Sequence, residues 1–224
     1  FASHCSERDI WLLESARFAI DLWLRTEATA QRFSIGQIWR PATTAAGSRT
    51  TLRDVVHQVV LALIESLRAH ESYWRNANAI SELHTWGTDP AVIPDVTPWD
   101  YQALADQARR DIVEIRPLLE DVLDPGLFVG VIDNVNGTTP RLDDELWVRT
   151  VYGVATAIQH GRAAIDHMAD MFVPPYMWRP ATFMSETQLE PPLAVQARLD
   201  ALCDTFQRLK PTLVASWSDP GGAP

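Results

Sequence analysis

The feature that most constrains the fold of this chain is an apolar stripe between residues 52 and 67. Apolar side chains recur there at the spacing i, i+3, i+4, i+7, and charged or polar residues occupy the positions between them. That spacing places the apolar side chains on one face of an α-helix, which another element must cover. The pattern therefore predicts an amphipathic helix of about five turns. Its apolar face consists of Leu52, Val55, Val56, Val59, Val60, Leu63, Ile64 and Leu67.

Later segments repeat this helical spacing, so most of the chain is expected to be helical. One helix is predicted to end near residue 122 and to kink at Pro117, because proline has no N–H to donate inside a helix. A longer helix is predicted from about residue 143 until Pro174–Pro175 stops it, and a last one over residues 195–209.

The segment before the first amphipathic helix has a different pattern. Residues 10–30 are rich in helix formers, whereas residues 33–39 alternate apolar and polar side chains, the period of a short strand that Pro41 ends. The fold class that we expect is mainly α: an irregular helical domain preceded by a short helix and strand.

Charge and hydropathy exclude two classes of partner. The chain of 224 residues carries 19 Lys plus Arg against 29 Asp plus Glu, a formal net charge of −10, so we expect no nucleic-acid surface. Its longest apolar run, residues 59–64, is far shorter than the roughly 20 residues of a membrane span. No signal peptide is visible, and a cytoplasmic location is the default expectation. The first residue is Phe1 rather than Met, which suggests a fragment or a processed chain.

Nucleotide-binding, zinc-protease and serine-hydrolase motifs are missing from the sequence, and three weaker groups of residues remain. The first is Asp21, which lies between Ile20 and Leu22–Trp23. Such an acid is either one polar position on an amphipathic helix or a carboxylate at a cleft. Taken alone, the residue pattern favours the solvated helix face.

The other two groups lie in the second half of the chain. His160, Asp166, His167 and Asp170 contain a histidine and an aspartate three residues apart, but a metal site in a helical bundle needs such pairs from facing helices. We therefore expect a solvated surface and no metal site. The segment Tyr176–Arg179 places aromatic side chains beside an arginine. These side chains either line a sugar or phosphate pocket or lock one helix onto another, and the sequence does not choose.

Three stretches near the start of the chain follow one another in an order that points to a family. They are Ala19-Ile-Asp-Leu-Trp-Leu-Arg-Thr-Glu-Ala28, Arg32-Phe-Ser-Ile-Gly-Gln-Ile38 and Leu52-Arg-Asp-Val-Val-His-Gln-Val-Val60. This order resembles the end of the catalytic domain in GT-A glycosyltransferases, in particular family-2-like enzymes and the mannosylglycerate synthase group. There, a Gly-x-Gly-Ile-Asp stretch opens a helix, a short strand follows and a helical domain begins. Residues 144–152 and 206–217 resemble that helical extension.

The resemblance implies roles for particular residues. The aspartate of the family motif faces the acceptor, where it binds hydroxyl groups or acts as a base, and the matching residue here is Asp21. Arg17, Trp23 and Glu27 are secondary substrate-binding candidates on the same helix. Two features differ from the family: Arg17-Phe18-Ala19 replaces Gly-x-Gly, and the loop over residues 41–48 contains no histidine. The intact enzyme would use Mg²⁺ or Mn²⁺, and we expect this chain alone to bind no metal.

The predicted organisation follows from the same resemblance. Residues 1–48 would be the C-terminal end of a GT-A-like catalytic domain and a remnant of its α/β fold, residues 49–217 a helical C-terminal domain, and residues 218–224 a flexible tail. The expected function is the C-terminal part of a sugar-nucleotide-dependent glycosyltransferase that transfers a hexose to a small polar acceptor. We expect enzymatic activity only when the chain is joined to a nucleotide-binding half.

The apolar helix faces leave a second function class open. A non-catalytic helical module for binding or assembly explains the faces of residues 52–67 and 146–172 equally well. Apolar faces that the missing half would cover also favour self-association.

Overall fold

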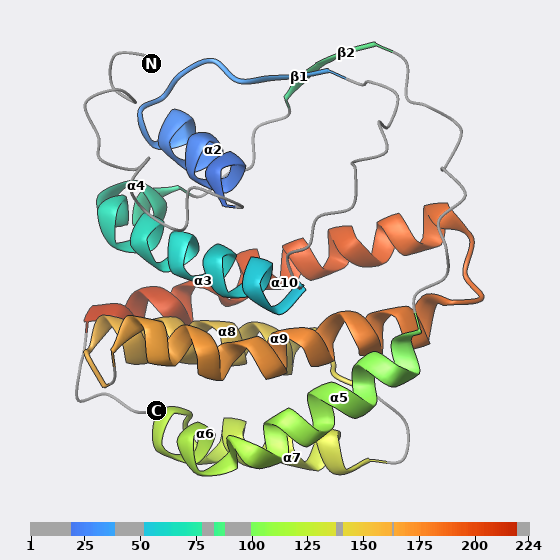
Figure 1. Ribbon diagram of the computed structural model, residues 1–224. Helices are drawn as coiled ribbons and strands as arrows, with labels where there is room; N and C mark the ends of the chain where they lie inside the picture. The colour runs from blue at the N-terminus through green and yellow to red at the C-terminus, as the bar shows by residue number, and fades with distance from the viewer. Residues whose placement is uncertain are drawn as a thin grey trace. The chain divides into compact units, whose positions relative to one another are not determined.

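The computed structural model describes residues 19–38, 52–77, 83–87, 100–137, 141–162 and 164–218. Within these ranges the chain forms nine helices and one two-stranded sheet, which confirms the predicted mainly α fold class (Figure 1). Contacts divide the chain into two compact units, unit 1 over residues 1–99 and unit 2 over residues 100–224. Arg17, the loop 41–48 and residues 219–224 lie outside the described residues.

Unit 1 is built around the helix that the apolar stripe predicts. This helix is α3 (Leu52–Ala69). Its side chains Val56, Val60 and Ile64 are only 3–4% exposed, whereas Leu63 of the same stripe is 37% exposed. Helix α2 (Ile20–Ala30) packs against α3, and the short helix α4 (Glu71–Asn76) follows α3 after a one-residue turn. The helix predicted from the apolar stripe is confirmed, because helical periodicity is a local property of the sequence.

The sheet of unit 1 consists of two parallel strands, β1 (Gly36–Ile38) and β2 (His84–Trp86). Gly36 lies opposite His84 and Ile38 lies opposite Trp86. The predicted strand over residues 33–39 is therefore confirmed over residues 36–38, whereas residues 33–35 are not in a strand and residue 39 lies outside the described residues. The sequence analysis did not predict β2. A side chain at position 36 would collide with the indole of Trp86, which accounts for glycine there.

Unit 2 is an all-helical bundle within its described residues, organised around one long helix, α9 (Ile165–Thr187). Helix α5 (Tyr101–Glu114) packs along α9, and α8 (Asp144–Gln159) lies beside α9 (Figure 1). Helix α10 (Pro192–Ser218) packs on α8. The short helices α6 (Arg116–Val122) and α7 (Pro125–Asn136) complete the unit. Its core includes Ile112, Leu119, Val148, Ile158, Met168 and Trp178, all at most 1% exposed.

Polar residues set the boundaries between the helices of unit 2. The predicted kink at Pro117 is a complete break: α5 ends at Glu114 and Pro117 lies in the first turn of α6. Asp124 and Asp143 begin α7 and α8, because their carboxylates accept hydrogen bonds from the backbone N–H groups of Gly126 (2.8 Å) and Leu146 (2.9 Å). Such caps satisfy N–H groups that have no partner inside the helix.

The predicted helix from residue 143 to Pro174–Pro175 is wrong at both its middle and its end. The chain breaks after α8, where Gly161 adopts a left-handed φ of 67°, and α9 then continues through Pro174, Pro175 and Pro180. Each proline lacks the N–H that would bond to the carbonyl four residues earlier. Helix α9 nevertheless buries most of its surface, including both Pro174 and Pro175. Tertiary packing therefore outweighs the local cost.

The contacts group α3 and α4 with α2 in unit 1, whereas the sequence analysis assigned them to the helical C-terminal domain. The boundary predicted between residues 48 and 49 refers to a family resemblance and stays a prediction.

Candidate functional site

The predicted acceptor residue, Asp21, is exposed on the first turn of α2. Its side chain is 68% exposed, and its carboxylate lies 3.9 Å from the guanidinium of Arg25, one helical turn later. A pair at this distance between exposed side chains holds neither of them firmly. Trp23 is half-buried on the same helix. The described contacts therefore leave Asp21 accessible but do not form a pocket around it.

Glu27 has the opposite environment on the same helix. Its side chain is 1% exposed, and its carboxylate accepts hydrogen bonds from His70 Nε2 (3.1 Å) and Gln31 Nε2 (3.3 Å). Because Glu27 follows Asp21 by six residues, the two acids point about 120° apart around the helix. The structure therefore does not bring Asp21 and Glu27 into one site.

His70 lies in the turn between α3 and α4, and its side chain is 12% exposed. Its hydrogen bond to Glu27 joins segments 43 residues apart, so it attaches α2 to the end of α3. A carboxylate that bonds one ring nitrogen of a histidine also sets the tautomer and the orientation of the ring. No sequence motif identified His70, because the pair arises only from the packing of α2 on α3.

The His160 group does not converge on one point. His160 donates from Nε2 to the carbonyl of Ser216 (2.8 Å), which ties the end of α8 to α10. Asp166, His167 and Asp170 lie exposed on α9. Across the described parts of the chain, no three His, Cys, Asp or Glu side chains are arranged to hold a metal ion.

The Tyr176–Arg179 segment packs inside unit 2, which is the second of its two predicted alternatives. Trp178 is 1% exposed and lies beneath the guanidinium of Arg109 from α5, at 5.5 Å from the ring centroid. Arg179 is buried; it donates to the carbonyl of Leu142 (2.9 Å) and forms an ion pair with Asp144 at the start of α8. These contacts lock α9 onto α5 and α8.

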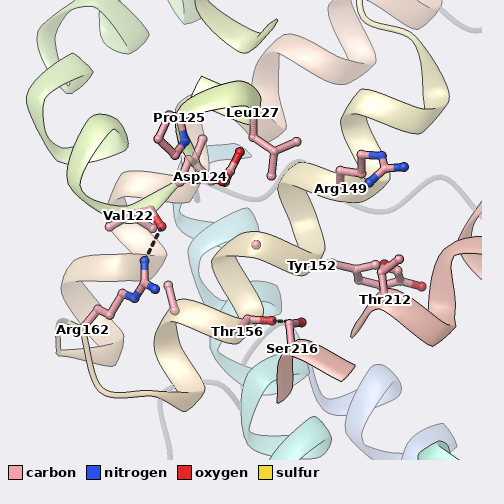
Figure 2. Close-up of a pocket in the computed structure, with 13 residues that line it drawn as sticks. Val122, Asp124, Pro125, Leu127, Arg149, Tyr152, Thr156, Arg162, Thr212 and Ser216 are labelled. Atoms are coloured by element: carbon pink, nitrogen blue, oxygen red, sulfur yellow. Dashed lines mark hydrogen bonds between the residues drawn. The ribbon is translucent and has the colours of Figure 1, made fainter. Parts of the chain in front are cut away.

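A cavity of about 220 Å³ lies within unit 2 between α8, α10 and the junction of α6 with α7 (Figure 2). Helix α8 forms its floor with a stripe at helical spacing: Arg149, Tyr152, Gly153, Thr156 and Ala157. The α6–α7 junction supplies one wall with Val122, Leu123, Asp124, Pro125 and Leu127, and α10 supplies the other with Thr212 and Ser216. Arg162 completes the lining. Most of this surface is apolar.

The polar groups in the cavity are largely held by the protein. Thr156 and Ser216 share a hydrogen bond of 3.1 Å between their hydroxyl oxygens, and the hydroxyl of Thr212 donates to the carbonyl of Leu209 (2.6 Å). Tyr152 donates its hydroxyl to the carbonyl of Phe206 (2.7 Å). Burial raises the pKa of Tyr152 to about 12, because the charged phenolate loses solvation there. Tyr152 is therefore neutral at physiological pH.

The two arginines at the cavity differ in their partners. Arg149 bonds Glu145 (2.9 Å), a carboxylate that also pairs with Arg208 (3.1 Å). Both guanidinium groups hold the pKa of Glu145 below its usual value. Arg162 donates to the carbonyl of Val122 (3.3 Å) and forms no ion pair within the described residues. Figure 2 places Arg149 and Arg162 at opposite ends of the cavity.

Sequence reasoning missed this cavity because three separate helical segments enclose it. The available signal was Gly153, a glycine in the middle of a helix, where it is less favourable than alanine by roughly 1 kcal/mol. Without a side chain at this position, the floor of the cavity stays open. A Cβ there would lie 3.4 Å from Leu127 and 3.5 Å from Leu123.

Comparison with known proteins assigns the chain to no family. No family model, no curated protein and no solved structure matches it. Among the helices of the described ranges, none has the length and hydropathy needed to cross a membrane.

Proposed function

We propose that this chain is the C-terminal, acceptor-side region of a cytoplasmic glycosyltransferase that uses a sugar nucleotide. The intact enzyme would move a hexose from a nucleoside diphosphate to a small polar acceptor with the help of a divalent cation. The observation that supports this best is the parallel pair of β1 and β2, with α3 and α4 in the connection between them.

Parallel strands joined through helices are typical of α/β domains. Two strands of three residues are too few to be stable in water by themselves. All residues of β1 and β2 are exposed, including Ile38 at 65% and Trp86 at 54%. The pair therefore fits the edge of a larger sheet with covered faces, such as the nucleotide-binding sheet of a GT-A domain.

In this proposal Asp21 acts on the acceptor. Its exposed carboxylate accepts a hydrogen bond from an acceptor hydroxyl and orients that oxygen for attack. Glu27 is too buried to touch a substrate in the described conformation, so its proposed role is to anchor α2 through His70. Trp23, half-buried beside Asp21, and Arg17 remain secondary candidates for binding the acceptor.

The divalent cation would need other ligands than those described here, because the described residues contain no group suited to hold it. We therefore derive no step of the transfer through a metal bound to this chain.

The coding sequence upstream of Phe1 provides the first test. We expect it to encode several strands and an Asp-x-Asp motif, and a natural start codon near Phe1 would contradict the proposal. The longer protein is then incubated with a panel of nucleoside diphosphate hexoses, small polyols or hydroxy acids, and Mg²⁺ or Mn²⁺. Release of the nucleoside diphosphate is measured with and without acceptor.

Asp21→Asn tests the residue assignment in that assay. The substitution keeps size and removes charge and basicity, so acceptor-dependent release should fall about 100-fold or more. Asp106→Asn, an exposed acid on α5, serves as the matched control and should leave the rate unchanged. Equal rates for Asp21→Asn and the wild type would exclude an acceptor role for Asp21.

The alternative, a helical assembly module, is favoured by the turn between α9 and α10. Leu189 and Leu193 are 93% and 82% exposed there, while Arg198 braces the turn by pairing with Glu190 (2.7 Å) and Glu186 (3.4 Å). Sedimentation velocity over a hundredfold concentration range tests this function. Association that Leu189→Glu with Leu193→Glu abolishes would support it, whereas a monomer at every concentration would exclude self-assembly.

A further inference from the structure

The geometry points to a ligand site in unit 2: the cavity on α8 binds a small organic anion with an apolar body, whose charged group contacts Arg162. This site is separate from Asp21 and does not depend on the proposed transfer reaction. The inference rests on three properties of the cavity: its shape, its charge and the state of its polar groups.

The shape of the cavity depends on Gly153. The glycine lies at the centre of the floor, between Arg149 and Thr156 on the same face of α8. A leucine at this position would project toward Leu123 and Leu127, which lie at contact distance from a Cβ. The volume of about 220 Å³ equals that of about seven liquid water molecules, so it suits a ligand of roughly eight to ten non-hydrogen atoms.

The charge around the cavity is opposite to that of the whole chain. The chain has a formal net charge of −10, but the cavity is lined by Arg149 and Arg162 against one acid, Asp124. Asp124 already caps α7 through the N–H of Gly126, and the helix N-terminus stabilises its negative charge. An anion in the cavity therefore meets an excess of positive charge.

Of the two arginines, Arg162 is the one placed to take the charged group. Arg149 shares Glu145 with Arg208, so its charge is partly compensated. Arg162 uses Nη1 to hold the carbonyl of Val122 and pairs with no carboxylate among the described residues. Its planar guanidinium retains donors in the fork geometry that matches a carboxylate or phosphate.

The remaining lining favours an apolar body over a sugar. The hydroxyl protons of Tyr152 and Thr212 are used in bonds to backbone carbonyls, so these groups have no donor left for a polyol. The walls formed by Val122, Leu123 and Leu127 are apolar, and burying an alkyl chain against them contributes roughly 0.8 kcal/mol per CH₂. A short-chain carboxylate has both the anionic group that Arg162 would contact and the apolar body that these walls would cover.

Three probes with the same six-carbon tail separate charge from hydrophobicity: hexanoate, 1-hexanol and hexylamine. Each is titrated into the full chain at neutral pH and low salt, and binding is followed by isothermal titration calorimetry and by amide chemical shifts. We expect saturable binding of hexanoate, with the largest shifts at residues 122–127 and 149–157. Affinity for 1-hexanol should be about tenfold weaker, and hexylamine should not bind.

Two variants assign the site to named residues. Arg162→Gln should lower the affinity for hexanoate about tenfold and leave the affinity for 1-hexanol unchanged, because the uncharged alcohol does not pair with the guanidinium. Arg110→Gln, on an exposed arginine of α5, is the matched control and should bind as the wild type does. Gly153→Leu fills the cavity and should abolish binding of both probes, with an unchanged circular dichroism spectrum showing that it folds.

Gly153→Ala keeps the proposal testable if the leucine variant does not fold. Alanine is more favourable than glycine inside a helix, and its methyl group narrows the cavity. The variant should therefore have a lower affinity for hexanoate while the chain stays folded. Equal affinities of the wild type for hexanoate and 1-hexanol would overturn the proposal. The absence of saturable binding, or wild-type affinity in Arg162→Gln, would overturn it as well.

Discussion

Among the described residues, each of the two units buries one charged side chain, and they do so in different surroundings. In unit 1, Glu27 of α2 is held by Gln31 at the end of the same helix and by His70 in the turn after α3. In unit 2, Arg179 of α9 is held by the carbonyl of Leu142 and the carboxylate of Asp144. The two groups that accept from Arg179 lie at the start of α8, whereas the described bonds of Glu27 come from its own helix and from the turn after α3.

The apolar surroundings also differ between the two pairs. The guanidinium of Arg179 lies over the ring of Phe183, at 5.6 Å from its centroid. Elsewhere on α9, Phe172 stacks on Trp147 of α8 at 5.6 Å. Glu27 is itself buried, whereas the other residues of α2 are half-buried or exposed. Truncating Arg179 leaves the carboxylate of Asp144 without its cation, whereas truncating Glu27 removes the charge itself, and a charge left without its partner is the costlier outcome. We therefore expect unit 2 to depend more strongly on its pair than unit 1 does.

The largest effect should come from Arg179→Met. The variant keeps the apolar part of the side chain but leaves the Leu142 carbonyl and the partly exposed Asp144 without their donor, so unfolding should become easier by about 2–4 kcal/mol. Urea unfolding followed by circular dichroism measures this, and hydrogen exchange shows whether the loss is confined to unit 2. Arg110→Met is the exposed control. A loss equal to that of the control would contradict the comparison.

Glu27→Ala should have a smaller effect, about 1–3 kcal/mol, because the substitution removes the buried charge itself and leaves only the His70 ring without this acceptor. Glu27→Gln keeps an oxygen that can accept the same bond and should recover most of the loss. Hydrogen exchange should show faster opening of α2 and α3 and leave α5 and α9 unchanged. If both variants lose the same free energy, the bond to His70 does not stabilise unit 1.

Tyr152→Phe should lower the stability of unit 2 by about 1 kcal/mol at pH 7, because the Phe206 carbonyl loses its donor. The same residue predicts a pH dependence. Its folded pKa of about 12 lies above the ordinary value of 10, so the folded chain holds the proton more tightly than the unfolded chain. This stabilisation is complete below pH 10 and is lost as the pH rises to about 12. The phenylalanine variant should lack this component of the alkaline loss, which unfolding between pH 9 and 12 would reveal.

The smallest effect is expected for Asp21→Asn, at most about 0.5 kcal/mol, since its pair with Arg25 is exposed and long. Thermal unfolding of Asp21→Asn and Glu27→Ala, measured side by side, compares the stability losses at an exposed and a buried acid of the same helix. A loss as large as that of Glu27→Ala would show that Asp21 has a structural role, which would weaken its assignment to the acceptor.

Much of the fold could be predicted from local patterns. The stripe on α3 and the alternation around β1 depend only on neighbouring residues, and both are found where the sequence places them. Strand β2 escaped prediction because three residues do not make a recognisable period, and it exists through its pairing with β1. The end of α9 was misplaced because proline is a strong local signal against a helix.

For the candidate sites too, local sequence patterns identified some residues and only packing placed the others. Asp21 was chosen for its resemblance to a family motif, and its side chain is exposed on α2. Glu27 was named as its neighbour, but packing placed it against His70 on another face of the helix. The lining of the cavity on α8 comes from segments up to 94 residues apart, and no window of sequence contains it.

The sequence by itself determined that this chain is mainly helical and where α3 and α8 begin, because periodicity and caps act within a few residues. Only the tertiary structure decided which charges are buried, that α9 passes through its prolines, and that Gly153 opens a cavity. These outcomes depend on the free energy of packing between distant segments, which exceeds the local preferences that a sequence displays.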